Sequence, residues 1–433
     1  MSNSNTPIKY DQNNPYYNGS VQRLYSVVDN PELLVSETSL GGSVFDVGTI
    51  FTIKGSDTTR AGFRHLVYQS LQDANEWSDL EEYLINNWGA GYFKNREIVK
   101  ETLEELKTTG LKTHHRGMVN RADGKLYSNS FPPELSNLTL IKKYTIHKPD
   151  SVNFMTSHYY DYEKYYGNDK FVIPLEYIVR FGVTSGSSIL RKYSKLSVSS
   201  KKAYLQDLDL KQDLIPWQTF DAPIIDLTTK YEPEDRNISR QEALLVSGIG
   251  GGMYSKSLVK AILASFIVHR IFNRMGLFLW DLKWEIAKDG DDLVFVDTLD
   301  TDSVRATLIC EVDGGNYIVN FNKQAMRDYY IIVHDDWYAA VNGAKQQAKE
   351  TGESFTQLLK QGQEQGTYPA TPEVDPAFMS IQEDKYDIIK KFIVEKGSGD
   401  DYQQEVAEIS RREVEYFLKS KNSDLYKKLN SVD

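Results

Sequence analysis

The chain has 433 residues, 40% of them hydrophobic and 26% charged, which is enough for about two or three globular domains with a sizeable core. Its formal net charge of −11 argues against a nucleic-acid-binding surface as its main role. A single cysteine excludes an internal disulfide, and the apolar run around Cys310 predicts a buried, unreactive thiol. The polar N-terminus and the interrupted apolar stretch near 258–279 predict a cytoplasmic protein without a membrane span.

The N-terminal part of the chain carries strand signals followed by helix signals. Residues 19–38 predict two strands around the turn DNPE, and residues 41–55 continue as strand with glycine punctuation. Helices are expected over 56–88 and 98–107, the first capped by Ser56 or Asp57. A strand is expected over 138–146, and the Tyr-rich segment that follows, 147–169, is expected to be a polar loop. The adjacent His114 and His115 are interpreted as a solvated pair rather than a metal site.

The middle of the chain begins with a strongly β stretch, 171–182, followed by a Ser-Gly-Ser turn and a basic segment. Residues 221–239, with two prolines, are expected to form a loop, and 239–276 two helices joined at the glycines of GIGGGM. GIGGGM lacks both the preceding strand and the following Lys-Ser/Thr that a phosphate-binding loop requires. We therefore interpret it as a flexible joint between helices.

The most informative stretch is 276–305, GLFLWDLKWEIAKDGDDLVFVDTLDTDSVR. Polar and apolar side chains alternate from Asp281 to Ile286, which is typical of a strand with one buried face. An Asp-Gly turn follows, and a second apolar run ends at Asp297, so the pattern predicts a β-hairpin. In such a hairpin we expect Asp297 to return close to Asp281, so that Asp281, Lys283, Glu285 and Asp297 share one surface.

Three carboxylates this close repel one another unless a cation lies between them. Hard oxygen ligands suit Mg²⁺, which proteins hold with one or two carboxylates together with substrate phosphates. The alternative interpretation is a solvated strand face with an incidental ion pair, and the spacing alone leaves both open. Beyond the hairpin we expect strands around Asp313-Gly314-Gly315, mostly helix from about residue 324, and a solvated helical tail over 397–433.

Six segments, in order along the chain, resemble the phosphoribosylaminoimidazole-succinocarboxamide synthase (SAICAR synthase) family. They are GSVQRLYSVVDNPELLV, VFDVGTIFTIKG, IPLEYIVRFGVTSGSS, APIIDLTTKYEPEDRNIS, GLFLWDLKWEI with VDTLDTDSVR, and FNKQAMRD. The resemblance implies an α+β fold in two lobes, an antiparallel small ATP lobe and a larger α/β lobe, with helices after them. The expected boundaries are 17–145 for the small lobe, 146–340 for the larger lobe and 341–433 for the C-terminal helical region.

The family joins aspartate to 5-aminoimidazole-4-carboxylate ribotide with ATP and Mg²⁺, and the resemblance implies a role for each matching residue. Asp281 and Lys283 are the expected catalytic residues, and Glu285 and Asp297 the expected metal ligands. The expected ATP-binding residues are Gly19, Arg23, Lys54 and Glu285. The expected substrate-binding residues are Glu176, Arg180, Gly186, Ser187, Lys230, Arg305, Lys323 and Arg327. The expected partners are these small molecules, without nucleic acid or membrane, and the chain is a candidate homo-oligomer.

The sequence departs from the family pattern where the resemblance places a phosphate-binding flap. Ser20 and Gln22 stand at the family's basic positions, Thr298 replaces the Glu after the metal Asp, and Asn322 replaces the Asp before Lys323. Three alternatives therefore stay open: a divergent ligase with another carboxylate or amine substrate, a non-catalytic nucleotide-binding protein, and a small-molecule or lipid kinase.

Overall fold

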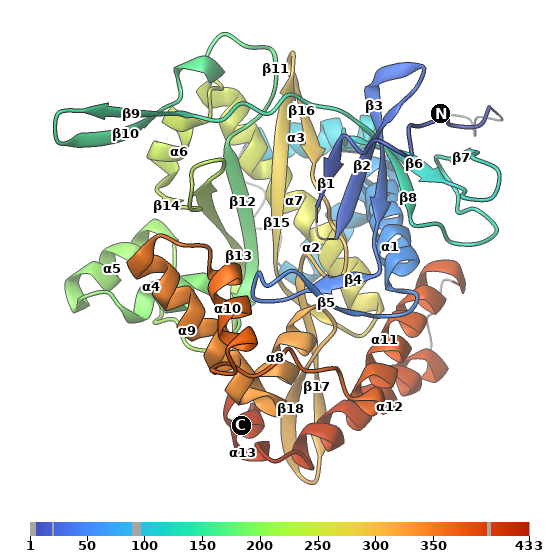
Figure 1. Cartoon of the computed structure of the whole chain (residues 1–433). Coiled ribbons are helices and arrows are strands. Elements are labelled where there is room, and N and C mark those ends of the chain that lie inside the picture. The colour runs from blue at the N-terminus through green and yellow to red at the C-terminus, as the bar shows by residue number, and fades with distance from the viewer. Residues whose placement is uncertain (1–5, 20, 89–96, 396–399, 433) are drawn as a thin grey trace.

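The computed structural model describes residues 6–19, 21–88, 97–395 and 400–432. An antiparallel sheet lies in the N-terminal part of the chain, in the order β1-β2-β3-β8-β6-β7 (Figure 1). The expected hairpin around DNPE is its β2–β3 pair, with Arg23 opposite Glu37. The strands span Tyr17–Asn18 (β1), Gln22–Val27 (β2), Asn30–Thr38 (β3), His115–Val119 (β6), Leu126–Tyr127 (β7) and Leu138–Lys142 (β8).

The larger antiparallel sheet has the strand order β14-β13-β12-β15-β17-β18 and contains the hairpin predicted within residues 276–305. Strands β11 and β16 pair with the C-terminal part of the long strand β15, residues 285–289. The strands span Lys170–Val172 (β11), Leu175–Val183 (β12), Gln218–Thr229 (β13), Asn237–Ile238 (β14), Phe278–Asp289 (β15), Asp292–Val296 (β16), Arg305–Val312 (β17) and Gly315–Asn320 (β18).

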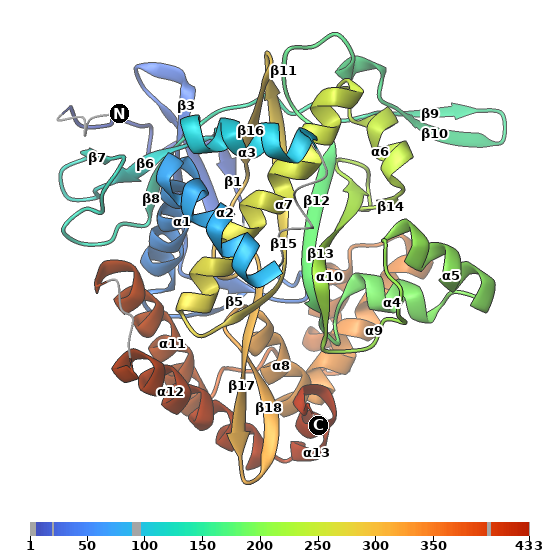
Figure 2. The same cartoon turned by 180° about the vertical axis from the view of Figure 1, so that it is seen from behind.

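Four helices cover the back of the molecule behind β12 and β15 (Figure 2). They are α1 (Ser56–Gln72), α2 (Ala74–Trp88), α3 (Glu97–Thr109) and α7 (Gly251–Arg274). Phe63 of α1 and Phe272 of α7 pack with their ring centroids 5.1 Å apart, and Trp284 of β15 is buried in the same core. One hydrophobic core therefore joins the N-terminal helices to the larger sheet.

The fold is the expected α+β arrangement of antiparallel sheets with C-terminal helices. The domain boundaries at 145 and 340 stay a prediction, because one hydrophobic core extends across both of them. The glycine joint is confirmed: α6 (Arg240–Val246) ends before Gly248, whose φ is 70°, and α7 begins at Gly251. None of the helices within the described ranges is long and apolar enough to cross a bilayer.

The expectation of a solvated C-terminal tail is wrong. Helices α12 (Asp400–Leu418) and α13 (Ser423–Asn430) pack against the larger sheet and bury Val414, Phe417 and Tyr426. The high overall charge of this segment hid a helical face of apolar residues. Cys310 is 8% exposed, so the prediction of a buried thiol is confirmed. The preceding helices are α8 (Gln324–Val333), α9 (Asp335–Thr351), α10 (Phe355–Glu364) and α11 (Pro376–Glu395).

Two segments expected as loops are strands. Residues 218–229 form β13, in which Pro223 is tolerated because the pairing with β12 is irregular between Arg180 and Gly182. The Tyr-rich segment contains the hairpin β9 (Asp150–Phe154) and β10 (Ser157–Asp161), which projects from the side of the molecule (Figure 1). Short elements complete the chain: β4 (Gly41–Ser43), β5 (Thr49–Thr52), α4 (Ser188–Ser194) and α5 (Val198–Asp207).

Candidate functional site

The predicted hairpin is present as β15 and β16, with Gly290 at a φ of 64° in the turn. Leu282, Trp284 and Ile286 are at most 1% exposed, which confirms the buried face of the alternating strand. The expected approach of Asp297 to Asp281 is wrong. Strand β16 starts immediately after a short turn and pairs Val296 with Glu285, so it ends before it can reach Asp281. Asp297 therefore lies beside Glu285.

The backbone of Asp297 is left-handed, with a φ of 72°. Such a conformation is uncommon outside glycine and costs energy, so it persists only where its surroundings hold it. The hydroxyl of Tyr68, a buried residue of α1, donates to the Asp297 carbonyl oxygen at 2.8 Å. Helix α1 thus fixes the peptide that presents the Asp297 carboxylate.

Five charged residues, on β12 and β15 and directly after β13 and β16, form a compact group that we call the strand-face cluster. Lys283 Nζ lies 2.6 Å from Glu176 Oε1 and 3.4 Å from Glu285 Oε1. Lys230 Nζ lies 2.7 Å and 3.0 Å from the same two oxygens. The members are Glu176, Lys230, Lys283, Glu285 and Asp297. Three carboxylates therefore face two ammonium groups.

The charges in this cluster are unevenly balanced. Burial raises the pKa of Glu285 to about 7, and the neighbouring Asp297 carboxylate adds to this rise. Burial also acts on Glu176, but Lys283 and Lys230 outweigh it and hold the pKa of Glu176 below its usual value. Burial opposes the charge of Lys283, yet the carboxylates around it raise the pKa of Lys283. The cluster has one carboxylate more than it has ammonium groups, and the resulting repulsion falls on the neighbouring carboxyl groups of Glu285 and Asp297.

A pair of oxygen ligands with surplus negative charge fits a hard divalent cation that completes its coordination with phosphates and water. Within the described ranges, no group of three or more His, Cys, Asp or Glu side chains is arranged to hold a metal by itself. The donor set thus fits a cation that arrives with a phosphorylated ligand better than a permanent metal centre.

Further along β15, Asp281 joins two arginines that were expected at a substrate phosphate. Its Oδ2 accepts from Arg305 Nη1 at 2.7 Å and from Arg180 Nη1 at 3.0 Å. Arg180 is buried and also donates to Asp226 at 3.0 Å, to Ser187 at 3.4 Å and to Ser188 at 3.2 Å. Arg180 is thus committed to protein carboxylates, whereas the Arg305 side chain is 30% exposed and keeps donors for a ligand.

A cavity of about 470 Å³ opens beside the strand-face cluster. Lys283 and Asp297 line it, as do Lys323 and Arg327, which flank the start of α8. Lys323 is exposed and, in the part of the chain that the structure describes, forms no ion pair, while Arg327 donates to Gln324 at 3.3 Å. Both cations line the cavity, and neither forms an ion pair with a carboxylate of the described residues.

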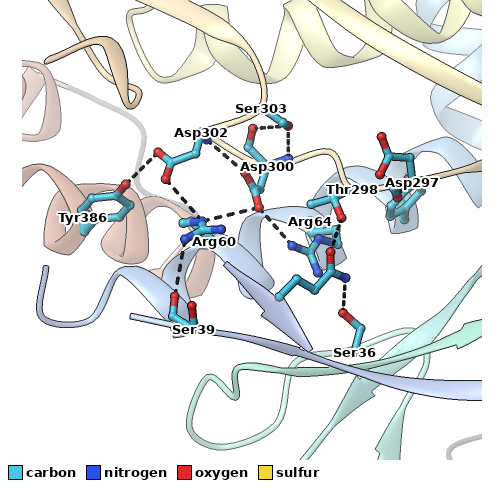
Figure 3. A network of polar contacts seen from close by, with 12 residues as sticks. Ser36, Ser39, Arg60, Arg64, Asp297, Thr298, Asp300, Asp302, Ser303 and Tyr386 are labelled. Atoms are coloured by element: carbon cyan, nitrogen blue, oxygen red, sulfur yellow. Dashed lines mark hydrogen bonds and ion pairs between the residues drawn. The ribbon is translucent and has the colours of Figure 1, made fainter. Parts of the chain in front are cut away.

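The sequence reading missed a second charged group that lines the same cavity, which we call the arginine–aspartate network (Figure 3). Arg64 Nη2 lies 3.0 Å from Asp300 Oδ2, and Arg60 Nε lies 3.5 Å from both Asp300 and Asp302. Tyr386 donates its hydroxyl hydrogen to Asp302 at 2.8 Å. The available signal was a pair of arginines four residues apart in a predicted helix, which places them on one face.

The expected nucleotide flap is only partly at the cavity. Gln22 lines it and accepts from the Thr298 hydroxyl at 3.0 Å, so two of the positions that depart from the family pattern contact each other. Arg23 points the other way, because neighbouring side chains on β2 alternate. Its side chain is 52% exposed and donates to Asn18 at 3.2 Å. The expected ATP contact of Arg23 is not supported, and no irregularity in β2 next to Arg23 brings it inward.

Three further predicted positions lie apart from the cavity lining. Gly19 donates its N–H to the Gln22 carbonyl at 2.9 Å, and Lys54 is exposed just before α1. Gly186 is exposed in the turn before α4. Ser20 lies outside the described residues. The interpretation of His114 and His115 as a solvated pair is wrong, because they are 7% and 1% exposed beneath α1.

Two solved structures to which this chain is similar are a SAICAR synthase and a SAICAR synthetase. A SAICAR synthase from Saccharomyces cerevisiae, solved with SAICAR, is 17% identical, covers 91% of this chain and 100% of its own, and gives a TM-score of 0.48. A SAICAR synthetase solved with ADP is 18% identical, covers 72% and 89% of the two chains, and gives a TM-score of 0.39.

Sequence comparison gives matches that are shorter but of higher identity. The phosphoribosylaminoimidazole-succinocarboxamide synthase of Thermoplasma volcanium is 32% identical over 182 residues, 41% of this chain and 59% of the relative. That of Streptomyces coelicolor is 29% identical over 170 residues, 38% of this chain and 53% of the relative. The chain thus aligns with little more than half the length of these two relatives. Residues 15–344, most of the chain, match the SAICAR synthetase family as a whole. The chain therefore belongs to the SAICAR synthetase family.

Proposed function

We propose that this protein is an ATP-dependent ligase that joins aspartate to 5-aminoimidazole-4-carboxylate ribotide and releases the succinocarboxamide ribotide, ADP and phosphate. The observation that carries the proposal is the strand-face cluster beside a cavity of about 470 Å³, in a chain that matches this family over residues 15–344. Its surplus negative charge on Glu285 and Asp297 suits a cation that accompanies ATP. A cytoplasmic location and a homo-oligomeric state remain predictions from the sequence.

In this proposal the γ-phosphoryl group of ATP passes to the ribotide carboxylate, and the amine of aspartate then displaces phosphate from the acyl phosphate. Glu285 and Asp297 would hold Mg²⁺, which neutralises charge on the ATP phosphates when it is bound. Lys283 lines the cavity and directs its ammonium group toward the carboxylates of the cluster, where it would stabilise charge on the transferred phosphoryl group. Glu176 and Lys230 hold that ammonium group and its partners in place.

The second half of the site would bind the ribotide. Arg305 is held at its Nη1 by Asp281 and presents its remaining donors, which suits bidentate binding of the 5′-phosphate. Arg180, Asp226 and Ser187 brace Asp281 from the buried side. Lys323 and Arg327 would reach substrate carboxylates from the start of α8.

The direct test is phosphate release by the purified chain with ATP, Mg²⁺, the ribotide and aspartate, together with reactions that omit one component each. We expect release only when all components are present, and an imidazole product whose mass corresponds to the succinocarboxamide ribotide. Asp297→Asn serves as the inactive control with the same fold. Release that does not need the ribotide or aspartate would contradict the ligase proposal.

One observation favours a non-catalytic nucleotide-binding protein as the second candidate. Gln22, which stands at a basic position of the family pattern, faces the cavity and is paired with the neutral Thr298. A neutral side chain there removes a charge-assisted contact to a phosphate. Isothermal titration of ATP with Mg²⁺ separates the two candidates: binding without turnover supports the second.

A further inference from the structure

One wall of the cavity comes from a helix outside the segment that matches the family. Residues 15–344 carry the match, whereas α11 spans Pro376–Glu395. Helix α11 packs against α1 and contributes Gln382, Lys385, Tyr386 and Ile389 to the cavity lining. A C-terminal helix therefore completes the site that the family segment begins.

Tyr386 is the α11 residue that reaches a charged group at the cavity (Figure 3). Its hydroxyl donates to Asp302 Oδ1 at 2.8 Å, and the Thr59 hydroxyl of α1 donates to its backbone carbonyl at 3.4 Å. Tyr386 is 8% exposed, while the Asp302 side chain is 22% exposed. A buried tyrosine thus holds a carboxylate that remains accessible from the cavity.

The other two polar side chains that α11 adds to the lining are occupied within the fold. Lys385 donates to the Asn320 carbonyl at 2.7 Å and pairs with Glu413 of α12. Gln382 donates to the same Glu413 carboxylate at 2.7 Å. These contacts attach α11 to α12 and to the larger sheet, and they leave Tyr386 as the side chain through which α11 acts on the cavity.

Three of the charged side chains that line the cavity suit one chemical class of ligand. Lys323 and Arg327 offer two cations, and Asp302 offers a carboxylate that Arg60, 3.5 Å away, only partly neutralises because Arg60 is equally close to Asp300. A molecule with two carboxylates and one ammonium group has the opposite arrangement of charge. Opposite charges at matched positions favour such a ligand over one that lacks the ammonium group.

We propose that Tyr386 is a positioning residue that holds Asp302 as the acceptor for the ammonium group of an amino-dicarboxylate substrate, whose carboxylates face Lys323 and Arg327. This inference rests on the proposed ligase function and assigns the binding site of its amine substrate. Without the tyrosine hydroxyl, Asp302 loses one of the two contacts that orient its carboxylate, and Arg60, 3.5 Å away, alone directs it.

The test is Tyr386→Phe, which removes one oxygen atom at nearly constant volume. A hydrogen bond to a charged group contributes about one order of magnitude, so we expect the KM for aspartate to rise roughly tenfold. The KM values for ATP and for the ribotide should change less than about twofold, since the inference assigns only the ammonium group of aspartate to Asp302. Tyr416→Phe is the matched control, because it removes a tyrosine–aspartate hydrogen bond of 3.0 Å to Asp375, away from the cavity.

Inhibition by succinate separates positioning from a structural role. Succinate has both carboxylates of aspartate but no ammonium group, so its inhibition constant should be the same in wild type and in Tyr386→Phe. Asp302→Asn should also raise the KM for aspartate, and the double variant should be no worse than the more impaired single variant. This second variant keeps the inference testable if Tyr386→Phe does not fold.

The outcomes distinguish this inference from the proposed function. An unchanged KM for aspartate in Tyr386→Phe, or an equal rise in the succinate inhibition constant, would overturn the inference while the ligase function stands. Wild type without turnover of ATP, ribotide and aspartate would overturn the proposed function, and the inference with it.

Discussion

The strand-face cluster and the arginine–aspartate network lie at one cavity but balance their charges in opposite ways. In the strand-face cluster, burial and the nearby Asp297 raise the pKa of Glu285 to about 7. In the network, burial also opposes the charge of Asp300, but Arg60 and Arg64 overcome it and lower the pKa of that carboxyl. The first region has an excess of negative charge that suits a cation from outside, and in the second Asp300 is paired with two arginines of the fold.

The largest expected effect is on catalysis and is expected in the strand-face cluster. Asp297→Asn removes a charged oxygen ligand at nearly constant volume and should lower Mg²⁺-dependent ATP turnover by about a thousandfold or more. The far-ultraviolet circular dichroism spectrum should not change, since Asp297 is exposed. Turnover near the wild-type rate would remove Asp297 from the metal site.

The next largest effect is on stability and is expected in the arginine–aspartate network. Asp300→Asn leaves Arg60 and Arg64, which are 4% and 2% exposed, without their shared counterion. Loss of one partner from a buried ion pair costs about 3–5 kcal/mol, which urea denaturation would measure.

Asp292→Asn is the matched control for that change. It removes the exposed pair between Asp292 and Lys112, whose side chains are 46% and 50% exposed, and should cost less than about 1 kcal/mol. Equal losses from the two variants would show that the network does not depend on Asp300.

The pH dependence of stability should distinguish the two regions further. A carboxyl whose pKa is raised on folding contributes stability that is present below its unfolded value and is lost as the pH rises through the folded value. For Glu285 this loss falls between about 4.5 and about 7 and amounts to at most about 3 kcal/mol. In metal-free buffer, Glu285→Gln should therefore gain stability relative to wild type from pH 5 to pH 8. Parallel pH profiles of the two proteins would contradict this.

The smallest effect is expected at the flap. Arg23→Ala removes an exposed side chain that points away from the cavity, so the Kd for ATP should change less than about twofold. Isothermal titration with and without Mg²⁺ measures it. A loss of tenfold or more would mean that β2 turns its outer face toward the nucleotide.

Local patterns predicted the elements whose signal lies within a few residues. Alternation from Asp281 to Ile286 gave the buried face of β15, and the Asp-Gly turn gave the β15–β16 hairpin. The partner of Asp297 could not be predicted in the same way, because it depends on where the strand pairing starts after the turn. A shift of a few residues along β15 exchanges Asp281 for Glu285 as its neighbour.

The network could not be predicted because its members lie far apart in the sequence. Arg60, Asp302 and Tyr386 come from α1, the segment after β16, and α11, and they meet only through tertiary packing. The same reason explains why the C-terminal segment was wrongly expected to be a solvated tail. The charged residues of 400–430 alternate with apolar residues at helical spacing, and only the larger sheet shows which face is buried.

The single cysteine can report on the motion of the C-terminal helices. Cys310 lies on β17 beneath α12, and burial raises the pKa of its thiol, so a thiol-reactive dye can modify it only when α12 lifts away from the sheet. No other cysteine competes for the dye. The labelling rate therefore measures how often the C-terminal helices open, and ligands that tighten α11 and α12 around the cavity should slow it.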